Sequence, residues 1–308
     1  MRHLTSLFDL TSAEVEEILA LAHDLKRQTK SGSRTPHCGG RVITQVFEKP
    51  SLRTRVSFEA GISQLGGTSI FLSGKDAGLN GRETIEDISK VLGGYSDIII
   101  LRTFSQELIE TVAKESGCAV INALSDDFHP CQALTDAMTI QEHLGEIKGK
   151  HLVYVGDGNN VAKSLALVCG HTGANLTVAA PNGYWLSDEF RNLAKKTFPN
   201  LELNQTSDPQ VAVKTADAIY TDVWASMGQE AEKEKRAAEF AGFQIDTDLL
   251  DIAGDNVLFM HCLPARRGLE VSDEAMDDSR SVIFEQAENR MHLAKGLMLW
   301  LLRQNSDA

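Results

Sequence analysis

Residues 150–180, KHLVYVGDGNNVAKSLALVCGHTGANLTVAA, carry the pattern that decides the fold of this chain. An apolar run at 150–155 is followed by a Gly-Asp-Gly turn at 156–158, a helical pattern at 160–171 and a second apolar run at 175–180. Two short apolar runs separated by a helix are typical of a βαβ unit, whose strands are parallel. The stretch therefore predicts an α/β fold with a parallel sheet.

The same alternation occurs on both sides of this stretch. We expect helices at 12–29, 51–65, 84–92, 133–144 and 288–302, and strands at 41–47, 69–72, 98–101, 218–221 and 257–260. Gly66 and Gly67 follow the second of these helices, where a left-handed residue commonly ends a helix. The pattern predicts two α/β domains joined near residues 133–148.

Length and composition limit the possible functions. The chain has 308 residues, enough for two domains, and its net charge of −13 argues against a surface for nucleic acids or anionic membranes. The five cysteines contain no C-x-x-C pair, which predicts neither a disulfide framework nor a cysteine-rich metal site. The N-terminal residues lack the apolar core of a secretory signal, so we expect a cytoplasmic enzyme.

Pro50-Ser-Leu-Arg-Thr-Arg55 lies between a predicted strand and a predicted helix. Backbone N–H groups and the positive end of the helix dipole face outward at such a junction. Ser51 and Thr54 add hydroxyl donors, and the guanidinium of Arg53 can bind phosphate oxygens through two N–H groups. The segment predicts a phosphate site, although an ordinary helix cap with surface arginines would have the same residues.

Two further polar segments follow predicted strands or precede predicted helices. In His129-Pro-Cys-Gln132 the imidazole and the amide could converge on one ligand oxygen, or His129 could simply bind a loop. Gly156-Asp-Gly-Asn-Asn160 invites a dinucleotide-binding interpretation, but Val161 stands where the third glycine belongs and no acidic residue follows Ala180. Asn159 and Asn160 instead bring polar side chains to the carboxyl edge of a sheet.

The later strands are followed by segments 222–230 and 261–267. Asp222 could bind an ammonium group while Ser226 and nearby N–H groups bind a carboxylate, which together describe the backbone of an amino acid. Cys262 is more easily explained as a packing or carbonyl-presenting residue than as a nucleophile. Arg290, at the start of the last predicted helix, would by itself be taken for a surface residue.

Taken together, these segments resemble the aspartate/ornithine carbamoyltransferase family, and its ornithine branch in particular. The motifs are Phe47-Glu-Lys-Pro-Ser-Leu-Arg-Thr-Arg55, His129-Pro-Cys-Gln132, Gly156-Asp-Gly-Asn-Asn160, Asp222-Val-Trp-Ala-Ser-Met-Gly228, His261-Cys-Leu-Pro264 and Glu288-Asn-Arg290. They occur in the family's order and cover nearly the whole chain. The resemblance implies a carbamoyl phosphate-binding domain at 1–140, an ornithine-binding domain at 141–287, and a C-terminal helix at 288–308 that returns to the first domain.

The resemblance also implies roles for individual residues. Carbamoyl phosphate would be bound by Ser51, the backbone N–H of Leu52, Arg53, Thr54, Arg102, His129, Gln132, Cys262, Leu263 and Arg290. Among these, the catalytic residues would be Arg102, His129, Gln132, Cys262 and Arg290, and ornithine would be bound by Asn160, Asp222, Ser226 and Met227. The implied reaction forms citrulline and phosphate without a metal or organic cofactor, as a step of arginine biosynthesis. The implied assembly is a homotrimer, or a multiple of it, with active sites between chains.

Two positions depart from the family pattern. Leu52 stands where the family often has a hydroxyl residue, and it is also found in relatives that act on acetylornithine or succinylornithine. Near Gly78, many relatives carry a glutamine that reaches the neighbouring chain. Acylated ornithine and putrescine therefore stay open as acceptors, a nicotinamide-dependent oxidoreductase is the alternative from another class, and a non-catalytic homologue is a third. The sequence does not distinguish biosynthetic from catabolic use.

Overall fold

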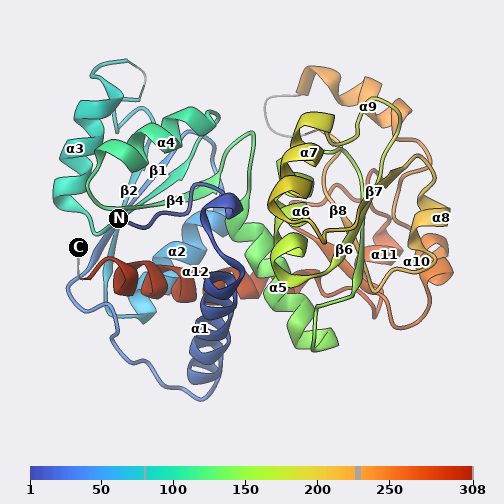
Figure 1. The fold of residues 1–308 in the computed structure, drawn as a ribbon, viewed down its shortest axis with the longest axis horizontal. Coiled ribbons are helices and arrows are strands. Elements are labelled where there is room, and N and C mark those ends of the chain that lie inside the picture. The colour runs from blue at the N-terminus through green and yellow to red at the C-terminus, as the bar shows by residue number, and fades with distance from the viewer. Residues whose placement is uncertain (80, 226–229, 307–308) are drawn as a thin grey trace. The chain divides into compact units, whose positions relative to one another are not determined.

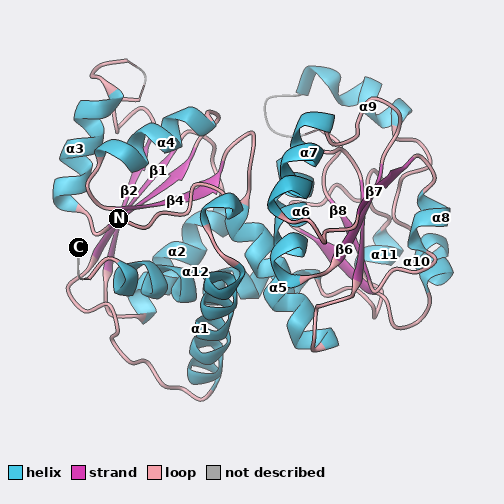
Figure 2. Ribbon diagram, viewed as in Figure 1, coloured by secondary structure: helices cyan, strands magenta, loops and turns pink. Residues whose placement is uncertain are grey.

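The computed structural model describes residues 1–79, 81–225 and 230–306 and divides the chain into two compact units (Figure 1). The first unit comprises Met1–Met138 and Glu288–Ala308, and the second comprises Thr139–Ala287. The boundaries fall within two helices, α5 (Pro130–Leu144) and α12 (Ile283–Gln304). Both units are α/β, with a parallel sheet between helices (Figure 2), which confirms the predicted fold class.

The sheet of the first unit has four strands in the order β2-β1-β3-β4. These are β2 (Thr68–Ser73), β1 (Val42–Phe47), β3 (Ile98–Arg102) and β4 (Ala119–Leu124), and every pair is parallel. The central strand β3 is wholly buried, as the β-branched run Ile98-Ile-Ile100 requires, whereas the edge strand β2 is partly exposed.

Helices cover both faces of this sheet (Figure 1). On one face lie α3 (Ile85–Tyr95) and α4 (Gln106–Glu115), which pack on an apolar cluster that includes Val46 and Leu101. On the other face lie α1 (Ser12–Lys30), α2 (Leu52–Gln64) and α12. Glycine permits the close packing of α1 and α12, since a Cβ on Gly296 would lie 2.7 Å from the Ala22 nitrogen. The predicted C-cap of α2 is confirmed, because Gly66 has φ +83°.

The sheet of the second unit has five parallel strands in the order β7-β6-β5-β8-β9. They are β7 (Leu203–Thr206), β6 (Asn175–Ala179), β5 (His151–Val155), β8 (Ala218–Thr221) and β9 (Leu258–His261). Helices α6 (Asn160–Thr172) and α7 (Asp188–Thr197) cover one face, and α8 (Pro209–Val213), α10 (Thr247–Ala253) and α11 (Asp273–Met276) cover the other (Figure 1). A short helix, α9 (Lys233–Glu239), follows the segment after β8.

Two predicted boundaries are wrong in ways that affect the site. The last helix begins at Ile283 rather than at 288, directly after Val282, whose N–H donates to the Phe259 carbonyl. Arg290 therefore lies inside the helix and does not open it. Helix α5 begins at Pro130 rather than at 133, so that His129 directly precedes the helix. Proline suits this first position because a helix leaves its first N–H groups without internal partners.

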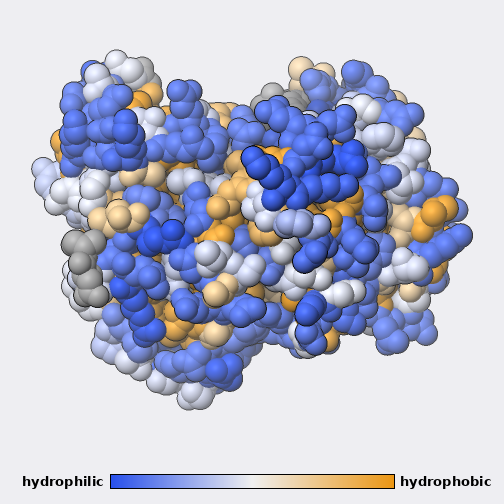
Figure 3. Space-filling model, in the orientation of Figure 1, coloured by the Kyte–Doolittle hydropathy of each residue, from blue (hydrophilic) through white to orange (hydrophobic). Residues whose placement is uncertain are grey.

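The visible face of the molecule is mostly polar (Figure 3). Hydrophilic residues cover most of the face shown in Figure 3. All five cysteines are free thiols, and four of them are buried. Within the described part of the chain, no helix combines the length and the apolar character needed to cross a membrane.

Candidate active site

Both sheets have a point at which the strand order reverses, and open α/β sheets bind ligands at the carboxyl ends of the strands at such points. In the first unit the reversal lies between β1 and β3, because β2 and β3 flank β1 on opposite sides. In the second unit it lies between β5 and β8. The candidate site residues gather at these two places and form one half-site in each unit.

In the first unit, the N-terminus of α2 follows β1 and supplies the predicted phosphate cradle. Ser51 is the N-cap residue, and its Oγ accepts a hydrogen bond of 3.3 Å from the Thr54 N–H. Thr54 is 2% exposed, and Arg53 is partly buried. By contrast, the Leu52 side chain is 74% exposed, so only its backbone remains to bind a ligand at this helix end.

Arg102 reaches the same place from the end of β3. The register of β3 and β4 shifts between Leu101 and Arg102, an irregularity of the kind that re-aims a side chain next to a site. Arg102 Nη1 donates to Thr54 Oγ1 at 3.4 Å, and Arg102 as a whole is 6% exposed. A second guanidinium, that of Arg290, donates to the same Thr54 oxygen from Nη2 at 3.5 Å.

His129 lies in the field of these cations. Burial lowers its pKa well below the ordinary value, and the positive charges of Arg290, Arg102 and Arg53 lower it further. The imidazole is therefore neutral at pH 7. A neutral ring can donate a hydrogen bond to a carbonyl oxygen without adding a fourth positive charge to the site.

Gln132 and Arg290 are joined although 158 positions separate them in the chain. Arg290 Nη1 donates to Gln132 Oε1 at 2.9 Å, and Gln132 Nε2 donates to Asp136 Oδ1 at 2.8 Å. Arg290 is 4% exposed, so it is not the surface residue that its position alone would suggest. The helix packing of α12 in the first unit brings it to the site.

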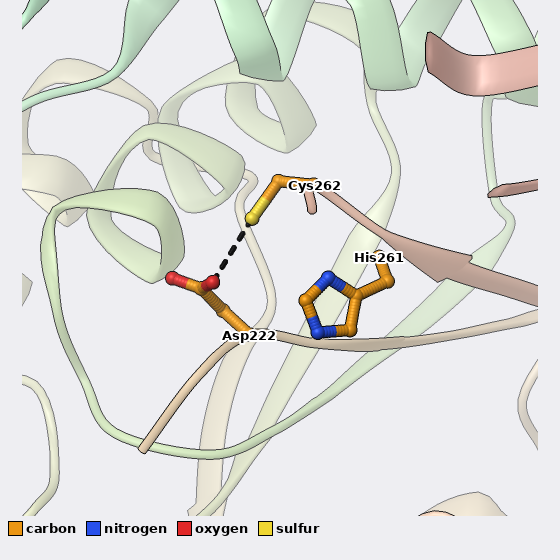
Figure 4. A group of neighbouring side chains, drawn as sticks. All are labelled: Asp222, His261 and Cys262. Carbon is orange, nitrogen blue, oxygen red and sulfur yellow. Dashed lines mark hydrogen bonds between the residues drawn. The ribbon is translucent and has the colours of Figure 1, made fainter. Parts of the chain in front are cut away.

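In the second unit, Asp222 follows β8 and is the centre of a hydrogen-bond cluster (Figure 4). Its Oδ1 accepts from the Cys262 thiol at 3.1 Å and from the Val223 N–H at 2.8 Å, and its Oδ2 accepts from Asn159 Nδ2 at 3.1 Å. Asp222 is 6% exposed. The three partners come from the ends of adjacent strands, so the carboxylate is held in one orientation.

Asn159 and Asn160 have different roles. Asn159 is the N-cap of α6, and its Oδ1 accepts from the N–H groups of Val161 at 2.9 Å and Ala162 at 3.2 Å. These are the donors that would bind the pyrophosphate of a dinucleotide. A Cβ on Gly158 would lie 2.6 Å from the Leu186 nitrogen, so the chain itself fills the space beside the turn. Both observations disfavour a nicotinamide cofactor. Asn160, the first residue of the helix, is partly buried.

Cys262, His261 and Asp222 lie close enough together to be considered as metal ligands (Figure 4). However, both ring nitrogens of His261 already have partners. Nδ1 accepts from the Leu263 N–H at 2.8 Å, which places the proton on Nε2, 3.3 Å from Glu270 Oε1. The histidine therefore supports the backbone of the Cys262–Leu263 turn, which carries two predicted site residues.

Arg236 was not among the sequence candidates, although it contacts the segment that follows Asp222. Its Nη1 lies 2.6 Å from Asp157 Oδ2 and 2.9 Å from the Trp224 carbonyl oxygen, and its Nε donates to Glu232 Oε2 at 2.8 Å. The sequence offered only a single arginine in a charged helix as a signal. Ser226 and Met227 lie outside the described residues.

Comparisons with known proteins identify the class. The family described as "Aspartate/ornithine carbamoyltransferase, carbamoyl-P binding domain" matches residues 2–142, and the "Asp/Orn binding domain" of the same family matches residues 148–301. The chain belongs to the aspartate/ornithine carbamoyltransferase family and is thus a carbamoyltransferase.

Its similarity is to the ornithine carbamoyltransferases of that family. It is 47% identical over 302 residues to the ornithine carbamoyltransferase of Methanosarcina acetivorans, with 98% of this chain and 99% of that protein covered. The corresponding protein of Bacillus subtilis is 46% identical over 310 residues, with coverages of 100% and 96%. The structure of the ornithine carbamoyltransferase from Pyrococcus furiosus has a TM-score of 0.95 and 44% identity, and covers 98% of this chain and 97% of that one.

Proposed function

We propose that this chain transfers the carbamoyl group of carbamoyl phosphate to the δ-amine of L-ornithine, giving L-citrulline and phosphate. The observation that carries the proposal is the placement of Arg102 and Arg290 on the hydroxyl of Thr54, beside a neutral His129, in a protein of net charge −13. Such a local concentration of positive charge suits a small, doubly charged anion.

The first half-site would bind carbamoyl phosphate. Its phosphate would be bound by the N-terminus of α2 through Ser51, Leu52, Arg53 and Thr54, with Arg102 beside them. His129, Gln132 and Arg290 would bind the carbamoyl group. Donors placed on the carbonyl oxygen stabilise the negative charge that develops there, at roughly 3–4 kcal/mol for each well-placed donor. No nucleophilic side chain is needed for this step.

The second half-site would bind ornithine. Asp222, held by Asn159 and Cys262, suits the α-ammonium group, and Asn160, Ser226 and Met227 would complete the binding of the amino acid backbone. The δ-amine, oriented near Cys262 and Leu263, attacks the carbamoyl carbon in its neutral form. The new C–N bond replaces the C–O bond to phosphate, which leaves with the electron pair, and the δ-nitrogen loses one proton.

The direct test of this reaction follows a labelled carbamoyl group. The purified chain is incubated with [13C]carbamoyl phosphate and L-ornithine, without added metal or cofactor, and citrulline and phosphate are quantified. The proposal expects 13C-labelled citrulline and unlabelled phosphate to form in equal amounts. Release of phosphate without citrulline would reject the acceptor assignment, and release of neither would reject the activity.

We also propose that the active form is a trimer or a multiple of it. Apolar side chains are exposed on α2, on the edge strand β2 and on α3, among them Leu52 at 74%, Ile70 at 43% and Tyr95 at 72%. Exposed apolar side chains also occur on the second unit, such as Trp185 at 42%, and the proposal places the interface on α2, β2 and α3. Light scattering should show a mass of at least three chains, and an active monomer would contradict the assembly.

A further inference from the structure

A buried carboxylate, that of Asp136, lies one helical turn from Gln132 on α5 and was assigned no role in the reaction. Asp136 is 0% exposed and Gln132 is 3% exposed. The carboxylate accepts from Gln132 Nε2 at 2.8 Å, while Arg290 donates to Gln132 Oε1 at 2.9 Å. The amide thus lies between a carboxyl group and a guanidinium.

These two partners determine the orientation of the Gln132 amide, that is, the directions of its oxygen and its nitrogen. A guanidinium can only donate hydrogen bonds, and Asp136 Oδ1 accepts the one from Gln132 Nε2. Gln132 must therefore direct its oxygen to Arg290 and its nitrogen to Asp136, because the reverse orientation would set donor against donor and acceptor against acceptor. The chemistry of the neighbours fixes this orientation.

The fixed oxygen faces the phosphate cradle. The guanidinium of Arg290 that binds Gln132 Oε1 through Nη1 also donates through Nη2 to Thr54 Oγ1. Gln132 Oε1 and the Thr54 hydroxyl are thus held by one rigid planar group. A carbonyl oxygen has two lone pairs, and Arg290 uses one of them. The other lone pair can accept a hydrogen bond.

We propose that Asp136 is a positioning residue that determines specificity: it fixes Gln132 as a hydrogen-bond acceptor for the –NH2 of the carbamoyl group. This inference rests on the proposed function, since it concerns the same ligand. A carbamoyl group can donate to Gln132 Oε1, whereas the acetyl group of acetyl phosphate, which has a methyl group in that place, cannot. Asp136 thereby lets the site distinguish the two acyl phosphates without touching either.

The test measures the dissociation constants of carbamoyl phosphate, acetyl phosphate and inorganic phosphate by calorimetry, without ornithine. We expect the unaltered protein to prefer carbamoyl phosphate over acetyl phosphate at least about tenfold, because a site that hydrogen-bonds a substrate group rejects the analogue lacking it. In Asp136→Ala this preference should fall to within about twofold of unity. The affinity for inorganic phosphate should stay within about twofold, because the cradle on α2 is unchanged.

Two further variants make the result specific. Asp136→Asn keeps an oxygen that can accept a hydrogen bond from Gln132, so its preference for carbamoyl phosphate should be lower than that of the unaltered protein and higher than that of Asp136→Ala. If Asp136→Ala does not fold, the lower preference of Asp136→Asn is the test. Thr135→Val is the matched control, since the Thr135 hydroxyl donates to the Cys131 carbonyl within the same helix at 2.7 Å. Its preference should be unchanged.

The outcomes separate the two proposals. An unaltered preference in Asp136→Ala or in Asp136→Asn, or an equal loss of affinity for all three ligands, would overturn the positioning role while leaving the proposed function intact. If the unaltered protein itself does not prefer carbamoyl phosphate, the proposed function fails and the inference with it.

Discussion

Arg236 and Asp157 form an ion pair of 2.6 Å that joins two segments of the second unit, the turn after β5 and the helix that follows β8. The exposed fractions of the two side chains are 9% and 16%. Burial raises the pKa of Asp157, and Arg236 opposes that rise. The same guanidinium binds the Trp224 carbonyl, two residues beyond Asp222. The pair therefore fixes the backbone next to the proposed ornithine-binding carboxylate.

The first prediction is that Arg236→Met weakens ornithine binding and destabilises the protein. The substitution leaves Asp157 buried without its cation and removes the donor to the Trp224 carbonyl. We expect a loss of roughly 3–5 kcal/mol in the free energy of unfolding. The KM for ornithine should rise at least about tenfold. Urea unfolding and steady-state kinetics provide the two measurements.

The matched control for this prediction is Arg267→Met. Arg267 also pairs with two carboxylates, Asp273 and Asp277, but its side chain is 37% exposed. Exposed pairs of this kind contribute about 0–1 kcal/mol. A double variant, Asp157→Asn with Arg236→Met, should recover part of the lost stability. The explanation by buried charge would be wrong if the double variant were no more stable than the single one.

The second prediction concerns the phosphate cradle. Arg53→Ala should abolish measurable binding of carbamoyl phosphate and leave the fold intact, because it removes a forked cation from the anion site. Arg55→Ala is the control: the Arg55 guanidinium stacks 3.7 Å from the centroid of the Phe71 ring and pairs with Glu59 at 2.9 Å. Calorimetry should show near-normal affinity of the control for carbamoyl phosphate. If Arg53→Ala binds carbamoyl phosphate as tightly as the unaltered protein does, the phosphate-cradle assignment is wrong.

The third prediction is that Asp222→Asn selectively impairs the use of ornithine. The charge-assisted hydrogen bond to the α-ammonium group contributes roughly 1.5–3 kcal/mol, so kcat/KM for ornithine should fall at least about tenfold. Carbamoyl phosphate affinity should barely change, because Asp222 belongs to the second half-site. A variant that loses affinity for carbamoyl phosphate and leaves the ornithine KM intact would reverse the assignment.

The fourth prediction concerns stability in acid and follows from His292, which is 1% exposed. Burial and the positive charge of Lys295 lower the pKa of His292 to about 4. In the unfolded chain His292 binds a proton near pH 6.5, whereas in the folded chain it stays neutral down to about pH 4. Protonation therefore favours the unfolded state, and His292 lowers the free energy of unfolding as the pH falls from 6.5 to 4. The contribution is roughly 3 kcal/mol.

Urea unfolding between pH 7.5 and 4 measures this contribution. His292→Gln should lose less free energy of unfolding over that range than the unaltered protein does. His37→Gln, a substitution in an exposed loop, should follow the unaltered protein. Parallel curves for all three proteins would show that His292 is not responsible for the acid sensitivity.

Local sequence signals sufficed for much of the fold. The βαβ pattern at 150–180 and the Gly66 cap depend on neighbouring residues only, and both are confirmed. Two elements that the pattern analysis missed, β4 and α4, do carry local signals: β4 (AVINAL) is largely apolar, and α4 (QELIETVAKE) buries Ile109, Val112 and Ala113 behind its N-cap Ser105. The start of α12 depends on a contact between Val282 and Phe259, which periodicity does not contain.

The candidate site shows the same limit. Motifs placed Ser51, Thr54 and Asp222 at strand and helix ends because the carboxyl edge of a parallel sheet is a local property of each strand. Arg290, Asp136 and Arg236 act through side-chain contacts with residues far along the chain or on another turn of the helix. No spacing rule in the sequence marks such contacts. The family resemblance named Arg290, whereas Asp136 and Arg236 came only from the structure.

The central claim, that the acceptor is ornithine, is tested most directly by a panel of amines. Phosphate release from carbamoyl phosphate is measured as an initial rate with L-ornithine, N-acetylornithine or putrescine at equal concentrations. In the proposed site Asp222 pairs with a charged α-nitrogen. We therefore expect ornithine to be the best acceptor by at least about tenfold, since the other two amines each lose part of the proposed backbone contacts. A higher rate with N-acetylornithine than with ornithine would contradict the claim. It would agree instead with Leu52, which is also found in relatives that act on acetylornithine.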